Sequence, residues 1–204
     1  MTDQFIVHVV DDDELVRDAL IEVLNMIGMR AKGYASANDF LGELTVDTAG
    51  CVVSDIRMPG ISGLELQKRL QQMDVYLPVI FITGHADVPM AVEAIQQGAA
   101  GFIQKPFREQ ELLDTIQQTM ERAELDYEKQ TAIKNIKSRL DSLSQREREV
   151  LEYISEGAAN KVIAAELGIS QRTVENHRAK LLEKLEVRTT AALIKVMVLA
   201  NSTS

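Results

Sequence analysis

The sequence predicts a doubly wound α/β domain with a five-stranded parallel sheet, followed by a long linker helix and a small all-α domain. Up to about residue 122, short apolar runs alternate five times with segments whose apolar residues recur every three to four positions. This alternation is typical of a parallel sheet with crossover helices. No Gly or Pro occurs between Phe107 and Gly157, which favours one continuous helix after the sheet. The chain therefore divides into residues 1–122, 123–138 and 139–204.

The five expected strands are short and mostly apolar, as strands buried on both faces are. They cover Phe5–Val10, Met29–Tyr34, Cys51–Ser54, Pro78–Thr83 and Gly101–Gln104. The first expected helix lies between Asp13 and Gly28, where Val16, Leu20 and Leu24 share one face. The next three helices are expected at Ala37–Leu44, Gly63–Met73 and Pro89–Gln97, and the linker helix from about Glu109 to about Ser138.

Charged and hydroxyl side chains stand where four of these strands end. A single Asp at a strand end is usually a helix cap, and a lone Lys-Pro is usually a turn. Four such groups at four strand ends favour a site, because ligands bind beyond the carboxyl ends of parallel strands. Crowded carboxylates need a cation, and oxygen ligands of this kind suit Mg²⁺. Phosphoryl transfer to Asp55 is the chemistry that this set predicts: Asp11, Asp12, Asp13, Asp55, Thr83 and Lys105.

The linker helix carries two apolar series that are out of phase by one residue. The first series is Leu113, Ile116, Met120, Ala123 and Tyr127, and the second is Ile133, Ile136, Leu140 and Leu143. Such a break weakens a continuous coiled coil. We expect Leu113 and Ile116 to dock on their own domain. From Tyr127 onward a partner or interdomain contact is expected, with docking on the same domain as the open alternative.

The last part of the chain has the layout of a helix-turn-helix. Ser144 and Glu147 form a capping-box pattern before a helix that Gly157 ends. A second helix begins near Asn160 and closes at Gly168, and Ser170 is a suitable N-cap for a third. A fourth helix is expected at Thr190–Leu199.

Charge is distributed unevenly along the chain. The net charge is −9, yet residues 1–124 hold 20 acidic and 9 basic residues, whereas residues 139–204 hold 9 and 10. This asymmetry indicates two different tasks. The chain has one cysteine, lacks a signal-peptide pattern and has no apolar stretch near the roughly 20 residues of a membrane span. We expect a cytoplasmic protein without a membrane partner.

Residues 5–122 resemble the receiver domain of two-component response regulators, which has a flavodoxin-like fold. The resemblance is carried by VVDDD, SDIRMPGISG, FITGHADVPMAVEA and FIQKPF, and the third motif is similar to the FixJ branch. It implies that Asp55 is the phosphoacceptor and that a sensor histidine kinase is the partner. It also implies a cis Lys105–Pro106 bond, and it assigns Asp13 to the start of the first helix instead of to the acidic pair that holds the metal. The remaining implied roles are Mg²⁺ ligands (Asp11, Asp12, Asp55 and the Arg57 main-chain carbonyl), phosphoryl contacts (Thr83, Lys105) and the switch (Thr83, Phe102).

Residues 139–200, which include LSQREREVLEYISEGAANKVIAAELGISQRTVENHRAKLLEKLEV, resemble the LuxR/NarL/FixJ DNA-binding domain. The resemblance implies a four-helix domain whose third helix, about Gln171–Leu185, enters the major groove of promoter DNA. Its last helix would pair two copies. Asn176 stands where this family often has an apolar residue, which leaves the base preference open.

Side-chain chemistry divides the residues of the third helix and its surroundings into readers, which contact base edges, and residues that contact phosphates. Glu175 could accept a hydrogen bond from cytosine, and Asn176 could pair with adenine. Arg172 or Lys180 could reach guanine. Candidates for phosphate contacts, which position a protein without reading sequence, are Lys161, Thr173, His177, Arg178, Lys184 and Arg188.

Two functions compete at this stage. The first is a transcription factor that is phosphorylated at Asp55, dimerises, and works with RNA polymerase at a promoter. The second is a metal-dependent phosphatase with an Asp nucleophile. Such phosphatases use a D-x-D pair, but Asp55 is followed by Ile56 and Arg57, so the second Asp is missing. This absence favours a regulator over an enzyme. His8, His85 and His177 are dispersed, which argues against a transition-metal site.

Overall fold

The structure, a computed structural model, describes residues 5–45, 47–73, 75–84 and 88–201. The chain forms two compact units, Met1–Tyr127 and Glu128–Ser204. The division falls inside the segment 123–138 that the sequence marked as a linker. The first unit has two hydrophobic cores, the first around Leu24 and Ile116 and the second around Phe40 and Leu66, and the second unit has a core of its own.

The first unit is built on a five-stranded, all-parallel sheet in the order β2-β1-β3-β4-β5. Its strands are β1 (Phe5–Val10), β2 (Ala31–Tyr34), β3 (Ala49–Asp55), β4 (Val79–Thr83) and β5 (Gly101–Gln104). All five predicted strands are therefore confirmed, and the fold is the expected flavodoxin-like one. The chain passes outward from β1 to β2 and then returns to β3, so the order reverses between β1 and β3. Such a reversal marks the place where ligands bind.

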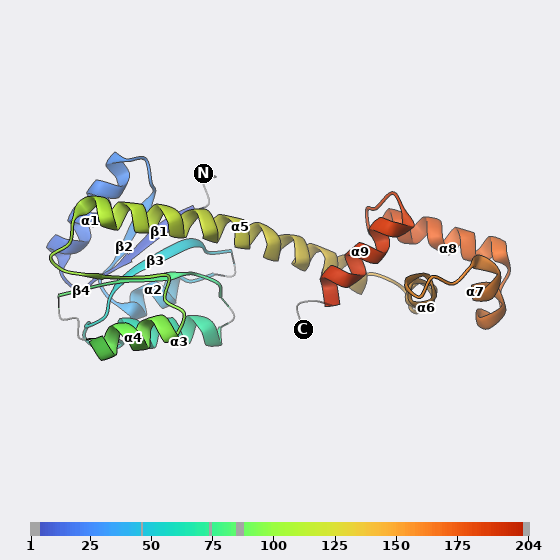
Figure 1. Cartoon of the computed structure of the whole chain (residues 1–204), viewed down its shortest axis with the longest axis horizontal. Helices are drawn as coiled ribbons and strands as arrows, with labels where there is room; N and C mark the ends of the chain where they lie inside the picture. Colours follow the sequence, from blue (N-terminus) through green and yellow to red (C-terminus); the bar gives the residue numbers. More distant parts are fainter. Residues whose placement is uncertain (1–4, 46, 74, 85–87, 202–204) are drawn as a thin grey trace. The chain divides into compact units, whose positions relative to one another are not determined.

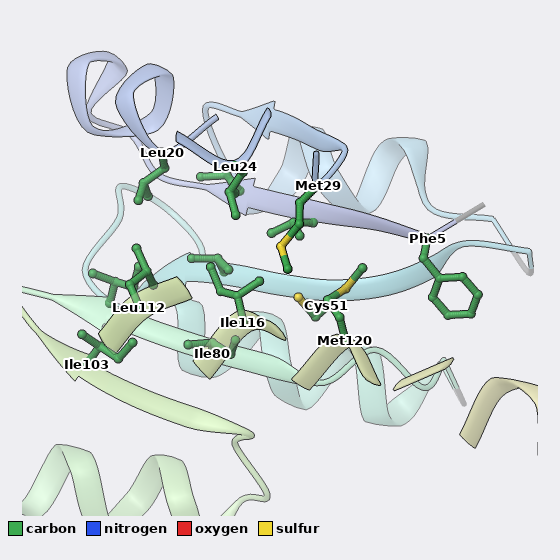
Figure 2. Close-up of a cluster of buried hydrophobic side chains, with 14 of the residues drawn as sticks. Phe5, Leu20, Leu24, Met29, Cys51, Ile80, Ile103, Leu112, Ile116 and Met120 are labelled. Atoms are coloured by element: carbon green, nitrogen blue, oxygen red, sulfur yellow. The ribbon is translucent and has the colours of Figure 1, made fainter. Parts of the chain in front are cut away.

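Helices cover both faces of this sheet (Figure 1). α1 (Glu14–Met26) and α5 (Glu109–Asp141) lie on one face, and α2 (Ala37–Glu43), α3 (Gly63–Gln72) and α4 (Val88–Gln96) lie on the other. Figure 2 shows Leu24 from α1 and Ile116 from α5 pointing toward the sheet residues of the first core. Asp13 caps α1 by accepting from the backbone N–H of Leu15 and Val16, which confirms its expected role as a helix start.

The linker helix is confirmed as one helix, α5, which continues for three residues beyond the predicted end at Ser138. Leu113 and Ile116 dock on the first unit, as expected. The partner or interdomain contact expected at Tyr127 is wrong, because its ring meets Phe5 edge-on with centroids 5.5 Å apart. At the other end of the second apolar series, Leu143 is buried in the core of the second unit.

The second unit contains the four predicted helices after the linker. They are α6 (Gln145–Ser155), α7 (Asn160–Leu167), α8 (Gln171–Lys184) and α9 (Thr190–Asn201). The capping box of α6 is present, since Ser144 and Glu147 exchange side-chain and backbone hydrogen bonds. Gly168 ends α7 in the left-handed region at φ 64°, which glycine adopts without the usual steric penalty. Ser170 caps α8 through the backbone N–H of Thr173.

Candidate functional site

The acidic site forms at the carboxyl edge of the sheet, where β1 and β3 are hydrogen-bonded neighbours. Val10 is in register with Ser54, so the next residues, Asp11 and Asp55, lie side by side although they are far apart in sequence. Asp55 is itself the last residue of β3, whereas the sequence placed it just past the strand. Carboxylate oxygens of Asp11, Asp12 and Asp55 all lie within 4.8 Å of one another. The predicted carboxylate cluster is thus assembled.

Lys105 brings a positive charge to these carboxylates. Its ammonium donates to Asp11 Oδ2 at 3.0 Å and lies 3.7 Å from Asp55 Oδ2. Its backbone N–H donates to the carbonyl of Thr83 at 2.8 Å, which ties the ends of β4 and β5 together. The Lys105–Pro106 bond is cis, as the sequence resemblance implied.

Asp11 is the most deeply buried member of the cluster, with 3% of its surface exposed. Its Oδ1 accepts from the backbone N–H of Asp13 at 2.9 Å, and its carbonyl accepts from the Arg17 guanidinium at 2.8 Å. Burial raises the pKa of the Asp11 carboxyl, and the hydrogen bond from Lys105 opposes that rise. An ionised Asp11 is therefore costly unless further positive charge is near.

The loop after Asp55 approaches the end of β3 closely. A Cβ at Gly63 would lie 2.4 Å from the carbonyl oxygen of Asp55, so only glycine fits there. Ser54 donates its hydroxyl to the same carbonyl at 2.8 Å, and the Arg57 backbone N–H donates to Asp55 Oδ1 at 3.2 Å. These contacts hold the Asp55 carboxylate at the edge of the sheet.

The cluster fits a hard divalent cation. Its three carboxylates offer only oxygen ligands. One of them, Asp12, is exposed to solvent. Few carboxylates with room for water suit Mg²⁺. The Arg57 main-chain carbonyl as a further ligand rests on the family resemblance alone.

The two expected switch residues lie on neighbouring strands. Thr83 is 1% exposed at the end of β4. Phe102 is half-buried on β5, where it pairs in register with Phe81 and packs against the second core. His85, which belongs to the predicted GHADVPMAVEA motif, lies outside the described residues.

The third helix of the second unit, α8, has a buried face and an exposed face. Val174, Leu181 and the C-cap Leu185 are buried in the core. Within the described part of the chain, four exposed cations make no ion pair and no side-chain hydrogen bond: Lys161, Arg172, Lys180 and Arg188. The predicted readers Glu175 and Asn176 are also exposed, in the first two turns of the helix.

Four other residues that were predicted to contact DNA make contacts within the second unit or are partly buried there. The Thr173 hydroxyl is 2.8 Å from that of Ser170. His177 is half-buried with a buried Nδ1. Arg178 donates to Asn160 and Thr190, and Lys184 donates to the buried Glu147 at 2.7 Å. The partners of Arg178 and Lys184 belong to other helices, and local sequence patterns do not reveal such contacts between helices.

Comparison with known proteins identifies both units. The response regulator receiver domain family matches residues 7–117, and the luxR family of bacterial regulatory proteins matches residues 141–197. The transcriptional regulatory protein FixJ of Azorhizobium caulinodans is 42% identical over 201 residues, covering 98% of this chain and 95% of that protein. The chain is a two-component response regulator of the FixJ type.

Other relatives agree with this assignment. The response regulator protein TmoT of Ectopseudomonas mendocina is 41% identical over 197 residues, covering 96% of this response regulator and 90% of TmoT. The solved structure of the response regulator StyR has a TM-score of 0.87 at 39% identity, covering 95% of this chain and 98% of that one.

These matches make the chain a transcriptional response regulator. Proteins of this family carry a receiver and a DNA-binding domain and are not typical enzymes. Among the described residues, no helix combines the length and the apolar character that crossing a bilayer requires.

Two residues beside the acidic site were not predicted from the sequence. Arg17 and Ser54 fix main-chain carbonyls beside the two central carboxylates. Arg17 lies one helical turn after the cap Asp13, and that spacing is the only signal that could have pointed to it.

Proposed function

We propose that this protein is a phosphorylation-controlled transcription regulator, in which a sensor histidine kinase transfers a phosphoryl group to Asp55. The observation that carries the proposal is the cluster of Asp11, Asp12 and Asp55 within 4.8 Å, with the Lys105 ammonium in reach of two of them. A carboxylate nucleophile beside cationic groups that can neutralise the phosphoryl oxygens is an arrangement suited to phosphoryl transfer.

The transfer itself is a substitution at phosphorus. A carboxylate oxygen of Asp55 forms the new O–P bond while the P–N bond to the kinase histidine breaks and the histidine leaves. The backbone N–H of Arg57, 3.2 Å from Asp55 Oδ1, orients that carboxylate. Lys105 neutralises part of the charge on the phosphoryl oxygens, and Thr83 is proposed to donate its hydroxyl to one of them. A Mg²⁺ held by Asp11, Asp12 and Asp55, with the Arg57 carbonyl, would supply the remaining positive charge.

The new phosphoryl group changes the balance between two states of the receiver. Phospho-Asp55 carries a charge of about −1.5 to −2 in place of the single negative charge of the free carboxylate. Thr83 moves toward the phosphoryl group, and Phe102 fills the vacated space. The face formed by α4 and β5 then pairs with a second receiver. A swing from 1:99 to 99:1 takes about 5.5 kcal/mol of differential stabilisation.

Pairing of two receivers would bring two DNA-binding domains to a two-fold promoter site. α8 enters the major groove, where Glu175 and Asn176 read bases with Arg172 or Lys180. α9 contributes to pairing, and the bound dimer contacts RNA polymerase. Phosphate contacts are proposed for the exposed Lys161 and Arg188, and for Thr173 and His177. We place this activity in the cytoplasm.

Labelling by a small phosphodonor tests the phosphoacceptor. With acetyl phosphate and Mg²⁺, the protein is expected to take up one phosphoryl group that peptide mapping locates at Asp55. Asp55→Asn is expected to abolish labelling, whereas Asp18→Asn, an exposed acid on α1, should leave it intact. Persistent labelling of Asp55→Asn at another residue would contradict the assignment.

A further inference from the structure

The cations of α8 fall into two groups with different surroundings. Arg172 and Lys180 are exposed, and the described residues provide neither with an ion pair. Arg178 and Lys184 donate instead to residues of other helices. A side chain that is held inside its own domain is less free to follow a DNA phosphate than an unpaired one on the surface.

Arg178 connects three helices through one guanidinium group. Its Nη2 donates to the Thr190 hydroxyl, in the first residue of α9, at 2.8 Å. Its Nη1 donates to Asn160 Oδ1, in the first residue of α7, at 3.2 Å. All three residues are half-buried. The planar fork of an arginine can hold two acceptors in fixed directions, which a lysine ammonium on its flexible stem does not do.

The surroundings at the start of α7 agree with a structural use of this fork. The N-cap of α7 is Ala159, which makes no side-chain capping bond. The first polar side chain of the helix, Asn160, is turned to Arg178 instead of to the helix's own backbone. At the far end of α8, Lys184 bonds the buried Glu147 of α6. The helix is thus tied at its middle and at its last turn.

We propose that Arg178 is a positioning residue that sets the orientation of α8 against α7 and α9, and that it does not bind a DNA phosphate. This inference rests on the proposed binding of DNA through α8. Thr190, the first residue of α9, lies outside the proposed DNA-reading helix. Through Arg178, the start of α9 helps to determine which α8 side chains reach the bases.

The test uses the full chain with acetyl phosphate and Mg²⁺, and a duplex that the unsubstituted protein enriches from a randomised DNA pool. Arg178→Met and Thr190→Val are each expected to weaken binding to this duplex, by roughly tenfold for a lost hydrogen bond to a charged group. The double variant should bind no more weakly than Arg178→Met alone, because both changes break the same contact.

Salt dependence separates positioning from phosphate binding. Arg178→Met should leave the slope of log affinity against log salt unchanged, whereas Lys161→Gln, at an exposed cation proposed to contact a phosphate, should reduce it by about 1. Arg178→Lys keeps the charge and should not restore affinity. Repeating the selection with Arg178→Met should give a broadened base preference, which a purely stabilising residue would not cause once the protein is folded.

Three results would overturn the inference. They are a reduced salt slope for Arg178→Met, recovery of binding in Arg178→Lys, and unchanged affinity in Thr190→Val. A double-mutant cycle of thermal unfolding between positions 178 and 190 tests the contact without DNA. An interaction free energy between the two positions would support the contact between Arg178 and Thr190 whether or not the protein binds DNA. If the unsubstituted protein then enriches no duplex, both the DNA-binding proposal and the role of Arg178 in it are wrong.

Discussion

Asp11 shows most directly how one residue determines the chemistry of the site. It is buried beside two other carboxylates, and burial raises its pKa. The protonated form is favoured more in the folded chain than in the unfolded one, so ionisation of Asp11 at neutral pH reduces stability. Lys105 relieves part of this cost. A divalent cation among the three carboxylates would relieve the remainder.

Mg²⁺ is therefore expected to raise the thermal unfolding midpoint of the protein. Binding to the folded state alone contributes about 2.7 kcal/mol at a concentration 100 times the dissociation constant, which corresponds to several degrees. Asp12→Asn should remove most of this increase, because Asp12 contributes to the cluster from its exposed side. The exposed Asp18→Asn is the matched control. Equal midpoints with and without Mg²⁺ in the unsubstituted protein would refute the metal site.

At the scale of single elements, the last turn of α8 depends on a buried carboxylate of α6. The hydrogen bond from Lys184, together with those from Ser144, lowers the pKa of Glu147 to about 2. Lys184 was predicted from sequence to meet only the DNA backbone. Its ion pair means that Lys184→Ala would also leave the Glu147 charge without its counterion, so weaker DNA binding in that variant would not identify a phosphate contact.

This pair predicts a pH dependence of the second unit. The folded pKa of about 2 lies below the ordinary value of 4.5, so the stabilisation is present above about pH 4.5 and is lost as pH falls toward 2. Lys184→Met should flatten the dependence of unfolding free energy on pH in this window, as measured by denaturant titration. Lys180→Met, on the exposed side of the same helix, should not. Parallel curves for Lys184→Met and the unsubstituted protein would argue against the ion pair.

The first two turns of α8 are expected to carry base recognition. Glu175→Ala or Asn176→Ala should relax specificity at one base position, by about 1–3 kcal/mol for a good bidentate pair. Both side chains are exposed, so little loss of folding stability should accompany the change. If Glu175 only complements the helix dipole, its loss would alter stability and not base preference. If selections on randomised DNA return the base preference of the unsubstituted protein for both variants, Glu175 and Asn176 are not readers.

Local patterns predicted most elements because the physical signals for them are local. The apolar runs gave all five strands, and Asp13, Ser144 and Ser170 marked helix starts that the structure confirms. Convergence of Asp11 and Asp55 was predictable because parallel strands end at one edge of a sheet. Tyr127 was assigned wrongly because its docking partner, Phe5, is more than 120 residues away in sequence.

The contacts of Arg178 and Lys184 could not be predicted for a related reason. A basic residue on a helix presents the same pattern whether its charge meets solvent, DNA or another helix. Only the packing of α6, α7 and α9 against α8 decides among these, and that packing brings Asn160 and Thr190 to Arg178.

At the scale of the whole molecule, the chain joins an acidic receiver to a nearly neutral DNA-binding unit through the continuous helix α5. The two units have separate cores, so the proposed phosphorylation of Asp55 is expected to affect the second unit through a change in the state of the receiver. Pairing of receivers is the proposed change.

Phosphorylation is accordingly expected to convert monomer to dimer only when Mg²⁺ is present, because the carboxylate cluster cannot accept another anion without a cation. Sedimentation with acetyl phosphate should show a mass near twice 22.7 kDa, and Asp55→Asn should stay at the single mass. An identical mass with and without phosphodonor and Mg²⁺ would defeat this part of the account.

The central claim is that phosphorylation of Asp55 controls DNA binding by α8. Its most direct test is the affinity of the full chain for a duplex enriched from a randomised pool, measured with and without acetyl phosphate in the presence of Mg²⁺. The account predicts that the phosphodonor tightens binding by at least about tenfold in the unsubstituted protein, equivalent to 1.4 kcal/mol, and has no effect on Asp55→Asn. Equal affinity in all four measurements would contradict it.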